Sequence, residues 1–244
     1  MKFSRLLSNR RTDAISKTSR VSFSLHRIAM ILAIIVAAFP ALVFAGAGIT
    51  TSRLDHLLDR VQAHYRQTNS FEAKFSEELT SPGGIKRKRK GTLYYRKPGR
   101  MRWEFAAPDS ETIVSDGTIV YSYQPDLNQV IETPVKQLLK SPGAVTFLLG
   151  FGDLRRDFKV SSPVTEQPDG LTHLILIPRE GGNRTDVGLN KKNLNLISLQ
   201  VIDAAGDSTF LRFRGWQENP VLADSLFNFT VPSGADIVRT PGAP

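Results

Sequence analysis

The alternation of apolar and polar side chains from Gly91 to Phe105 is the feature that most restricts the fold of this chain. Successive side chains of an extended strand point to opposite faces of a sheet. If the Pro98-Gly99 turn preserves the alternation, one face carries Leu93, Tyr95, Lys97, Met101, Trp103 and Phe105. The other face carries Tyr94, Arg96, Arg102 and Glu104. The run therefore predicts two strands of a sheet with one apolar and one solvated face.

The segments around this run predict one helix followed by many short strands. Apolar residues at helical spacing, including Leu54, Leu58 and Val61, predict an amphipathic helix over Thr51 to Asn69. Asp116-Gly117 is a strong hairpin signal. The expected strands are Phe71 to Thr80, Gly91 to Arg96, Met101 to Phe105, Thr112 to Val114, Thr118 to Gln124, Gln129 to Thr133, Phe158 to Ser161, Leu171 to Pro178, Thr185 to Leu189, Leu196 to Asp203, Ser208 to Trp216 and Leu226 to Val231.

These elements indicate a mainly β, α+β fold. Ten or more strands joined mostly by short turns predict a large antiparallel sheet that is curled or nearly closed. Between Gln137 and Phe151 the alternation stops, and Pro142, Gly143 and Gly150 separate apolar residues. We interpret that stretch as short helical pieces. A curled sheet with a few helices is a cup that a lid can cover.

The amino terminus has the order of a secretory signal peptide. Seven basic residues precede an apolar run from Ile28 to Phe44, and small residues follow it. We expect residues 1–45 to be cleaved, after Ala45 or after Ala47, which leaves residues 46–244 as a single domain. Residues 46–51 and 239–244 are expected to be flexible ends.

Composition then argues for an exported protein with little affinity for nucleic acid. The whole chain has a net charge of +9, but residues 1–45 hold seven of its 32 basic residues and one of its 23 acidic residues. The remaining 25 basic and 22 acidic residues give only +3, which is weak attraction for a polyanion. The chain has no cysteine, so it forms no disulfide and takes no lipid anchor on cysteine. We expect a soluble periplasmic protein.

Residues with the patterns of catalysis or metal binding are missing from the sequence. It contains no G-x-S-x-G, H-E-x-x-H, P-loop or G-x-G-x-x-G motif. His56, His64 and His173 lack the spacing of metal ligands. We expect no enzyme activity, no metal and no cofactor.

Five consecutive basic residues, Lys86 to Lys90, form the densest charge run. The run follows Ser81-Pro82-Gly83-Gly84, so a solvated hairpin is the favoured interpretation. Docking to anionic lipid head groups or to an acidic partner is the alternative, since basic residues are drawn to such surfaces. Nucleic acid is the least favoured partner because no aromatic residues interleave the run.

Lys97 decides between two interpretations of the apolar face. Its neighbours Trp103 and Met101 are typical of a packed core, and composition alone favours that interpretation. A buried ammonium without partners is costly, however, so Lys97 should lie at a rim, bonded to backbone carbonyls or to solvent. A rim indicates an opening.

An ordered series of residues resembles the periplasmic outer-membrane lipoprotein carriers, the LolA family. The series starts with Ser70-Phe71-Glu72-Ala73-Lys74-Phe75 and continues through Lys97-Pro98-Gly99-Arg100-Met101-Arg102-Trp103-Glu104-Phe105. Pro108 and Ile113-Val114-Ser115-Asp116-Gly117 follow, and then Tyr121, Tyr123, Pro125, Gln129-Val130, Asp203 and Gly206. It ends with Phe227-Asn228-Phe229-Thr230-Val231-Pro232-Ser233-Gly234. The resemblance covers roughly Ser52 to Val238.

The resemblance implies an unclosed antiparallel barrel, capped by helices, around an apolar cavity for the acyl chains of a lipoprotein. The residues assigned to the cavity are Phe75, Leu93, Tyr95, Met101, Trp103, Phe105, Tyr121, Leu211 and Phe213. The residues assigned to the lid are Leu54, Leu58, Phe147, Leu148, Leu149 and Phe151. An arginine that holds the lid precedes the proline of the motif in well-known members, and this chain has Lys97 there. The latch therefore falls to Lys97 or to a neighbouring arginine, Arg96 or Arg100.

The resemblance also implies partners. Such carriers bind acylated lipoproteins, receive them from an inner-membrane ABC-type lipoprotein-releasing complex, and pass them to an outer-membrane acceptor lipoprotein or to the outer membrane itself. We expect a monomer. An acyl-chain-binding sensor or envelope interaction module of the same fold, without carrier activity, is the alternative, and an enzyme ranks third.

Overall fold

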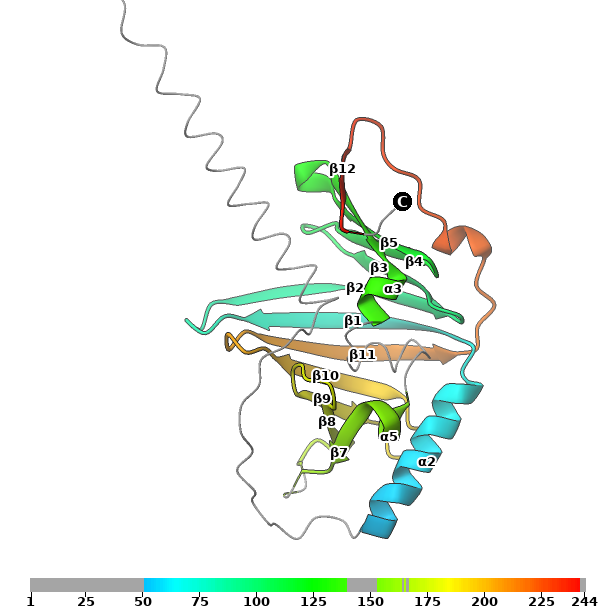
Figure 1. Ribbon diagram of the computed structural model, residues 1–244, viewed down its shortest axis with the longest axis vertical. Helices are drawn as coiled ribbons and strands as arrows, with labels where there is room; N and C mark the ends of the chain where they lie inside the picture. Colours follow the sequence, from blue (N-terminus) through cyan, green and yellow to red (C-terminus); the bar gives the residue numbers. More distant parts are fainter. Residues whose placement is uncertain (1–50, 140–152, 164, 166, 242–244) are drawn as a thin grey trace, which may run out of the picture.

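A computed structural model of the protein describes residues 51–139, 153–163, 165 and 167–241. Twelve strands form one sheet in the order β12-β6-β5-β4-β3-β2-β1-β11-β10-β9-β8-β7. The end strands β12 and β7 do not pair with each other, so the sheet stays open. This confirms the predicted unclosed, mainly β architecture, which Figure 1 shows with a few helices packed beside the sheet.

The strand bounds lie within two residues of the predicted ones for ten of the twelve expected segments, whereas β2 begins at Lys86, five residues before the expected start at Gly91. The strands are β1 (Ser70–Thr80), β2 (Lys86–Arg96), β3 (Arg100–Phe105), β4 (Thr112–Asp116), β5 (Ile119–Gln124), β6 (Gln129–Pro134), β7 (Phe158–Ser161), β8 (Thr172–Pro178), β9 (Thr185–Leu189), β10 (Leu196–Ile202), β11 (Ser208–Glu218) and β12 (Asp236–Arg239). Short helical elements are η1 (Pro125–Leu127), α3 (Val135–Leu139), α5 (Leu154–Asp157) and η2 (Asp224–Phe227). The expected signal peptide, residues 1–45, lies outside the described residues.

The opening helix α2 runs over Thr51–Gln67, as the apolar spacing predicts. Its residues Leu58, Val61 and Tyr65 are buried in the same apolar cluster as the sheet, and Leu54 and Leu57 pack against that cluster. Packing of one apolar stripe rather than helix propensity stabilises such a helix. Within the described residues no helix is long and apolar enough to span a bilayer.

The register of β2 and β3 confirms that the Pro98-Gly99 turn preserves the alternation. Leu93 pairs with Trp103 and Tyr95 pairs with Met101, so these side chains share one face of the sheet. Tyr94 pairs with Arg102 on the opposite face. Hereafter the face with Trp103 is called the inner face, and the other is called the outer face.

The carboxyl-terminal part differs from the prediction. Leu226 to Val231, expected as a strand, begins within η2 and continues without strand pairing. The alternating aromatic residues of this segment pack onto the outer face, where Phe229 stacks on Tyr121 with ring centroids 5.1 Å apart. The alternation of aromatic residues in this segment therefore reflects packing on the outer face and not pairing with another strand. The last strand is instead β12, which pairs with β6 in parallel and ends inside the range expected to be flexible, at Arg239.

Candidate functional site

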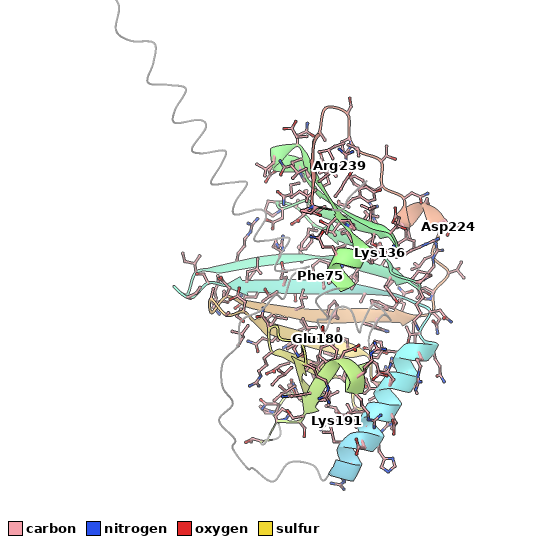
Figure 2. The ribbon with its side chains drawn as sticks, viewed as in Figure 1. Phe75, Lys136, Glu180, Lys191, Asp224 and Arg239 are labelled. Carbon is pink, nitrogen blue, oxygen red and sulfur yellow. The ribbon has the colours of Figure 1, made fainter. Side chains whose placement is uncertain are left out.

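An aromatic and aliphatic cluster covers the inner face at the centre of the sheet. Phe75 lies on β1 at its middle (Figure 2), with its ring centroid 4.9 Å from Trp103 and 5.1 Å from Phe105. Trp103 in turn lies 6.3 Å from Phe213 of β11. Edge-to-face pairs at these separations add to the free energy of area burial. The contacts link β3, β1 and β11, which lie within four consecutive strands of the sheet, β3-β2-β1-β11.

Eight of the nine residues assigned to the cavity lie in this cluster. Their exposed fractions run from 1% for Tyr95 to 9% for Leu211. The eight are Phe75, Leu93, Tyr95, Met101, Trp103, Phe105, Leu211 and Phe213. They are brought together here as a packed interior.

Tyr121, the ninth residue, was assigned wrongly. It pairs with Val114, which is on the outer face with Arg102, and its ring stacks on Phe229. The physical reason is parity: β5 presents Val120 and Ser122 inward, so the tyrosine between them points outward. The aromatic character of Tyr121 suggested the cavity, but only the strand register shows which face its side chain occupies.

The absence of a side chain at Gly91 leaves the space that the Phe75 ring occupies. A Cβ atom on Gly91 would lie 2.7 Å from Cζ of Phe75 and 2.0 Å from the carbonyl oxygen of Glu104. Only a residue without a side chain therefore fits at this point of β2. The glycine that opens the predicted strand run is required by the packing of the inner face.

Lys97 connects the sheet to the opening helix. Its Nζ donates hydrogen bonds to the carbonyl oxygens of Tyr65 (2.6 Å) and Arg66 (2.9 Å). These carbonyls belong to the last turn of α2, where backbone acceptors lack intrahelical donors and a positive charge is favourable. Partial burial lowers the pKa of the Lys97 ammonium from its ordinary value. The structure confirms the predicted bonding to backbone carbonyls.

The neighbouring arginines point elsewhere. Arg96 donates to the carbonyl oxygen of Leu222 at 2.9 Å and pairs with Asp224. Arg100 lies 3.4 Å from the same carboxylate, which belongs to η2 on the outer side. Among the described residues Lys97, and neither arginine, therefore bonds the helix.

The two described lid residues sit on α2, which is anchored at a second place. Leu58 is buried and Leu54 is partly buried against the inner-face cluster. Arg155 of α5 bonds the helix through Asp59 and through the carbonyl oxygen of Asp55 (2.8 Å). The other residues assigned to the lid, Phe147, Leu148, Leu149 and Phe151, lie outside the described residues.

A buried ionic triad on the inner face was missed in the sequence. Arg89 donates to Glu77 (2.5 Å) and to Glu111 (2.7 Å), and its guanidinium lies 4.0 Å from the centre of the Phe105 ring. The Arg89 side chain is 2% exposed, so the interpretation of Lys86 to Lys90 as wholly solvated was wrong. Parity was the available signal, since Arg89 lies two residues before Gly91 and shares its face.

Comparison with known proteins identifies the family. A family model described as outer membrane lipoprotein carrier protein LolA matches residues 66–230. The chain belongs to this family. An outer-membrane lipoprotein carrier protein of Cupriavidus necator is 33% identical over 187 residues, covering 74% of this chain and 87% of the relative. One from Bordetella avium is 34% identical over 190 residues, covering 76% and 88%.

The LolA family match includes the whole inner-face cluster of the sheet, from Phe75 on β1 to Phe213 on β11. Among solved structures, a LolA superfamily protein from Nitrosomonas europaea aligns at 12% identity with a TM-score of 0.41, covering 72% of this chain and 97% of that one.

Proposed function

We propose that this protein is a lipoprotein carrier that shields acyl chains from water between the inner and the outer membrane. The observation that carries the proposal is the large apolar cluster on the inner face, packed against a helix that polar bonds hold in place. Membership of the lipoprotein carrier family agrees with this function.

The energetics explain why such a protein needs an apolar interior. An acyl chain of about 15 methylenes loses roughly 12 kcal/mol on transfer to water, at ~0.8 kcal/mol per CH₂. An interior as favourable as a bilayer would hold the chain too tightly for delivery. Contacts that close the empty protein offset part of the binding free energy, so transfer stays reversible.

In this proposal Lys97 and α2 form the closure. Acyl chains that reach Trp103 and Met101 separate α2 from the inner face and break the bonds from Lys97 to the helix carbonyls. A lysine supplies a point charge and no planar fork, so this closure is easier to open than one made by arginine. The described side chains that would leave the cluster are Leu54 and Leu58, together with Leu57, Val61 and Tyr65 of the same helix.

The finer parts of the proposal concern location and partners. Residues 1–45 direct export to the periplasm as a cleaved signal peptide. There the mature protein, a monomer, receives acylated lipoproteins from an inner-membrane ABC-type complex and gives them to an acceptor lipoprotein or to the outer membrane itself. The apolar run before Ala45 and the absence of cysteine support export.

Capture of cargo tests the function directly. The purified protein is incubated with inner-membrane vesicles that contain lipoprotein and the releasing complex, then recovered and analysed by mass spectrometry. We expect an acylated lipoprotein in a one-to-one complex with the wild-type protein. Recovery of the protein without any acylated cargo contradicts the proposal.

A charged substitution tests the assignment of the inner face. Met101→Glu places a carboxylate among the aromatic rings, and we expect cargo recovery to fall at least about tenfold, the ratio that ~1.4 kcal/mol represents. Val221→Glu is the matched control because Val221 is fully exposed. Circular dichroism verifies that both variants are folded. Undiminished cargo recovery with a folded Met101→Glu protein rejects the assignment.

A further inference from the structure

The outer face of the central strands carries a row of exposed basic side chains. Lys74 pairs directly with Arg214, while Lys90 and Arg212 flank Ser76 from the two neighbouring strands. With Lys86 and Lys88 they form what we call the basic face, residues Lys74, Lys86, Lys88, Lys90, Arg212 and Arg214, all of them exposed. These residues lie on the opposite side of the sheet from the inner-face cluster, and none of them belongs to that cluster.

Acidic residues neutralise only part of this charge. Glu78 lies 2.7 Å from Lys86 and 3.4 Å from Lys88, so one carboxylate serves two ammonium groups. Glu72 is the other acidic residue of β1 on this face. Six cations against two carboxylates leave a strong positive field over three adjacent strands.

An exposed isoleucine stands at the end of the basic face. Ile85 lies in the β1–β2 turn after Gly83 and Gly84, and it is 77% exposed. Residues Lys86 to Lys90 of β2 extend beyond β3, whose register with β2 ends at Gly91 and Phe105. Figure 1 shows this hairpin projecting from the sheet at the end opposite the carboxyl terminus of α2.

A second turn lies beside the first. A Cβ atom on Gly206, in the β10–β11 turn, would be 3.5 Å from Cγ of Pro82, so the two tips are in contact distance. Ile202, at the end of β10, is 49% exposed and lies on the outer face because it pairs with Ser208. Two aliphatic side chains thus stand at the edge of a basic surface.

This combination of charge and single aliphatic residues fits an anionic bilayer better than a protein. A protein interface of useful affinity needs a contiguous, well-packed core, whereas these two isoleucines belong to separate hairpins. A bilayer surface accepts isolated aliphatic side chains among lipid chains while its phosphates attract the lysines and arginines. We propose that the basic face and Ile85 dock the protein on membranes rich in anionic phospholipid.

Docking by the outer face leaves α2 and the inner face free. The carrier is then concentrated at a membrane surface while Lys97 and the closing helix remain accessible for exchange of cargo. Because the contact is peripheral, it is reversible and sensitive to salt. Membrane binding should therefore be the same with and without lipoprotein.

Vesicle sedimentation tests the proposal. The exported protein is mixed with vesicles of phosphatidylglycerol and phosphatidylethanolamine, or of phosphatidylcholine alone, with no lipoprotein present, so the result does not depend on the carrier function. We expect binding to the anionic vesicles at 50 mM NaCl, at least about tenfold weaker binding to phosphatidylcholine, and release at 0.5 M NaCl. Equal binding to both compositions, or to neither, overturns the proposal; the latter result points to an acidic protein partner.

Two variants locate the contact. The triple change Lys86→Gln, Lys88→Gln and Lys90→Gln should weaken binding at least about tenfold, since each cation near an anionic surface counts for about fivefold. Ile85→Ser should weaken it about fivefold without changing the salt dependence. The matched controls are Lys136→Gln, Lys159→Gln and Lys192→Gln together, which remove the same charge elsewhere, and Val221→Ser. Equal losses in the test and control proteins overturn the proposed site.

Discussion

Lys97 shows how one side chain couples a sheet to a helix. It stands at the end of an apolar row, yet its ammonium reaches the last carbonyl groups of α2 rather than solvent. Hydrogen bonds from a charged donor contribute about 1.5–3 kcal/mol when they are well formed. The residue therefore fastens α2 to the sheet without adding to the apolar core.

Replacement of Lys97 tests this role. Lys97→Met keeps the length of the side chain and removes its donors, and we expect a loss of about 1–2 kcal/mol of unfolding free energy and faster uptake of a fluorescent fatty acid. Lys97→Arg is the matched control, since its fork can serve both carbonyls and should keep or slow the wild-type uptake rate. Lower stability of the Met variant with unchanged uptake contradicts a closing role.

Arg89 presents the opposite case, a charge fully enclosed by the sheet. Removal of one partner from a buried ionic group costs about 3–5 kcal/mol because the others remain desolvated and unpaired. We expect Arg89→Met to lower the unfolding free energy by that amount in urea titrations at pH 7. Lys88→Met, one residue earlier on the outer face, should change it by no more than about 0.5 kcal/mol. Similar small effects at both positions would refute the triad's burial.

At the scale of elements, several polar contacts from the sheet and from α5 hold α2 in place. Lys97 bonds its carboxyl-terminal carbonyls, and Arg155 of α5 bonds Asp59 in its middle. The backbone N–H of Leu154 in α5 donates a hydrogen bond to Oε1 of the Gln62 side chain on α2 at 3.0 Å. Polar groups therefore attach the helix outside its apolar stripe, and the apolar stripe packs on the inner face of the sheet.

The Asp59–Arg155 contact predicts a dependence on pH. The Arg155 guanidinium lowers the pKa of Asp59 below its ordinary value in the folded protein. The unfolded chain thus binds more protons near pH 4, so this contribution is complete above the unfolded pKa of about 3.9 and disappears as the pH falls through the lowered value. Thermal unfolding of wild type and Asp59→Asn should differ at pH 6 and converge toward pH 3. A difference that persists unchanged at pH 3 contradicts the ion pair.

At the scale of the whole molecule, the open sheet has a different cover on each face. Helix α2 and α5 lie over the inner face of one half. The segment from Leu222 to Phe229 binds the outer face of β2 to β5 through Arg96, Arg102 and Tyr121. An unclosed sheet has no ring of hydrogen bonds to fix its curvature. Separation of α2 from the inner face is the movement that the proposed function requires.

Distance measurements test that movement. The chain has no cysteine, so spin labels attach only where cysteine is introduced. With labels at Arg60→Cys on α2 and Lys90→Cys on β2, we expect the distance to lengthen when a triacylated lipopeptide binds. The control pair Lys90→Cys and Lys192→Cys, which samples only the sheet, should not change. Movement of the control pair to the same extent would mean that the sheet itself deforms.

The sequence by itself determined the local structure and the two faces of the sheet. Period-two alternation places Leu93, Tyr95, Met101 and Trp103 together, and turn chemistry at Asp116-Gly117 separates two strands, because both depend on residues that are adjacent in the chain. The same reasoning placed Lys97 at a rim, since an ammonium has to find acceptors. Alternation also predicts that the Arg89 side chain points inward, but a charged residue in a basic run was expected to be solvated.

Only the tertiary structure decided which distant groups meet. The acceptors of Lys97 lie more than 30 residues away on α2. The triad joins Arg89 of β2 to Glu77 of β1 and to Glu111, the residue before β4. Tyr121 and the segment from Leu226 to Val231 were misassigned for the same reason, because apolar residues satisfy either face until pairing fixes the register. Long-range pairing therefore decided what covers each face of the sheet.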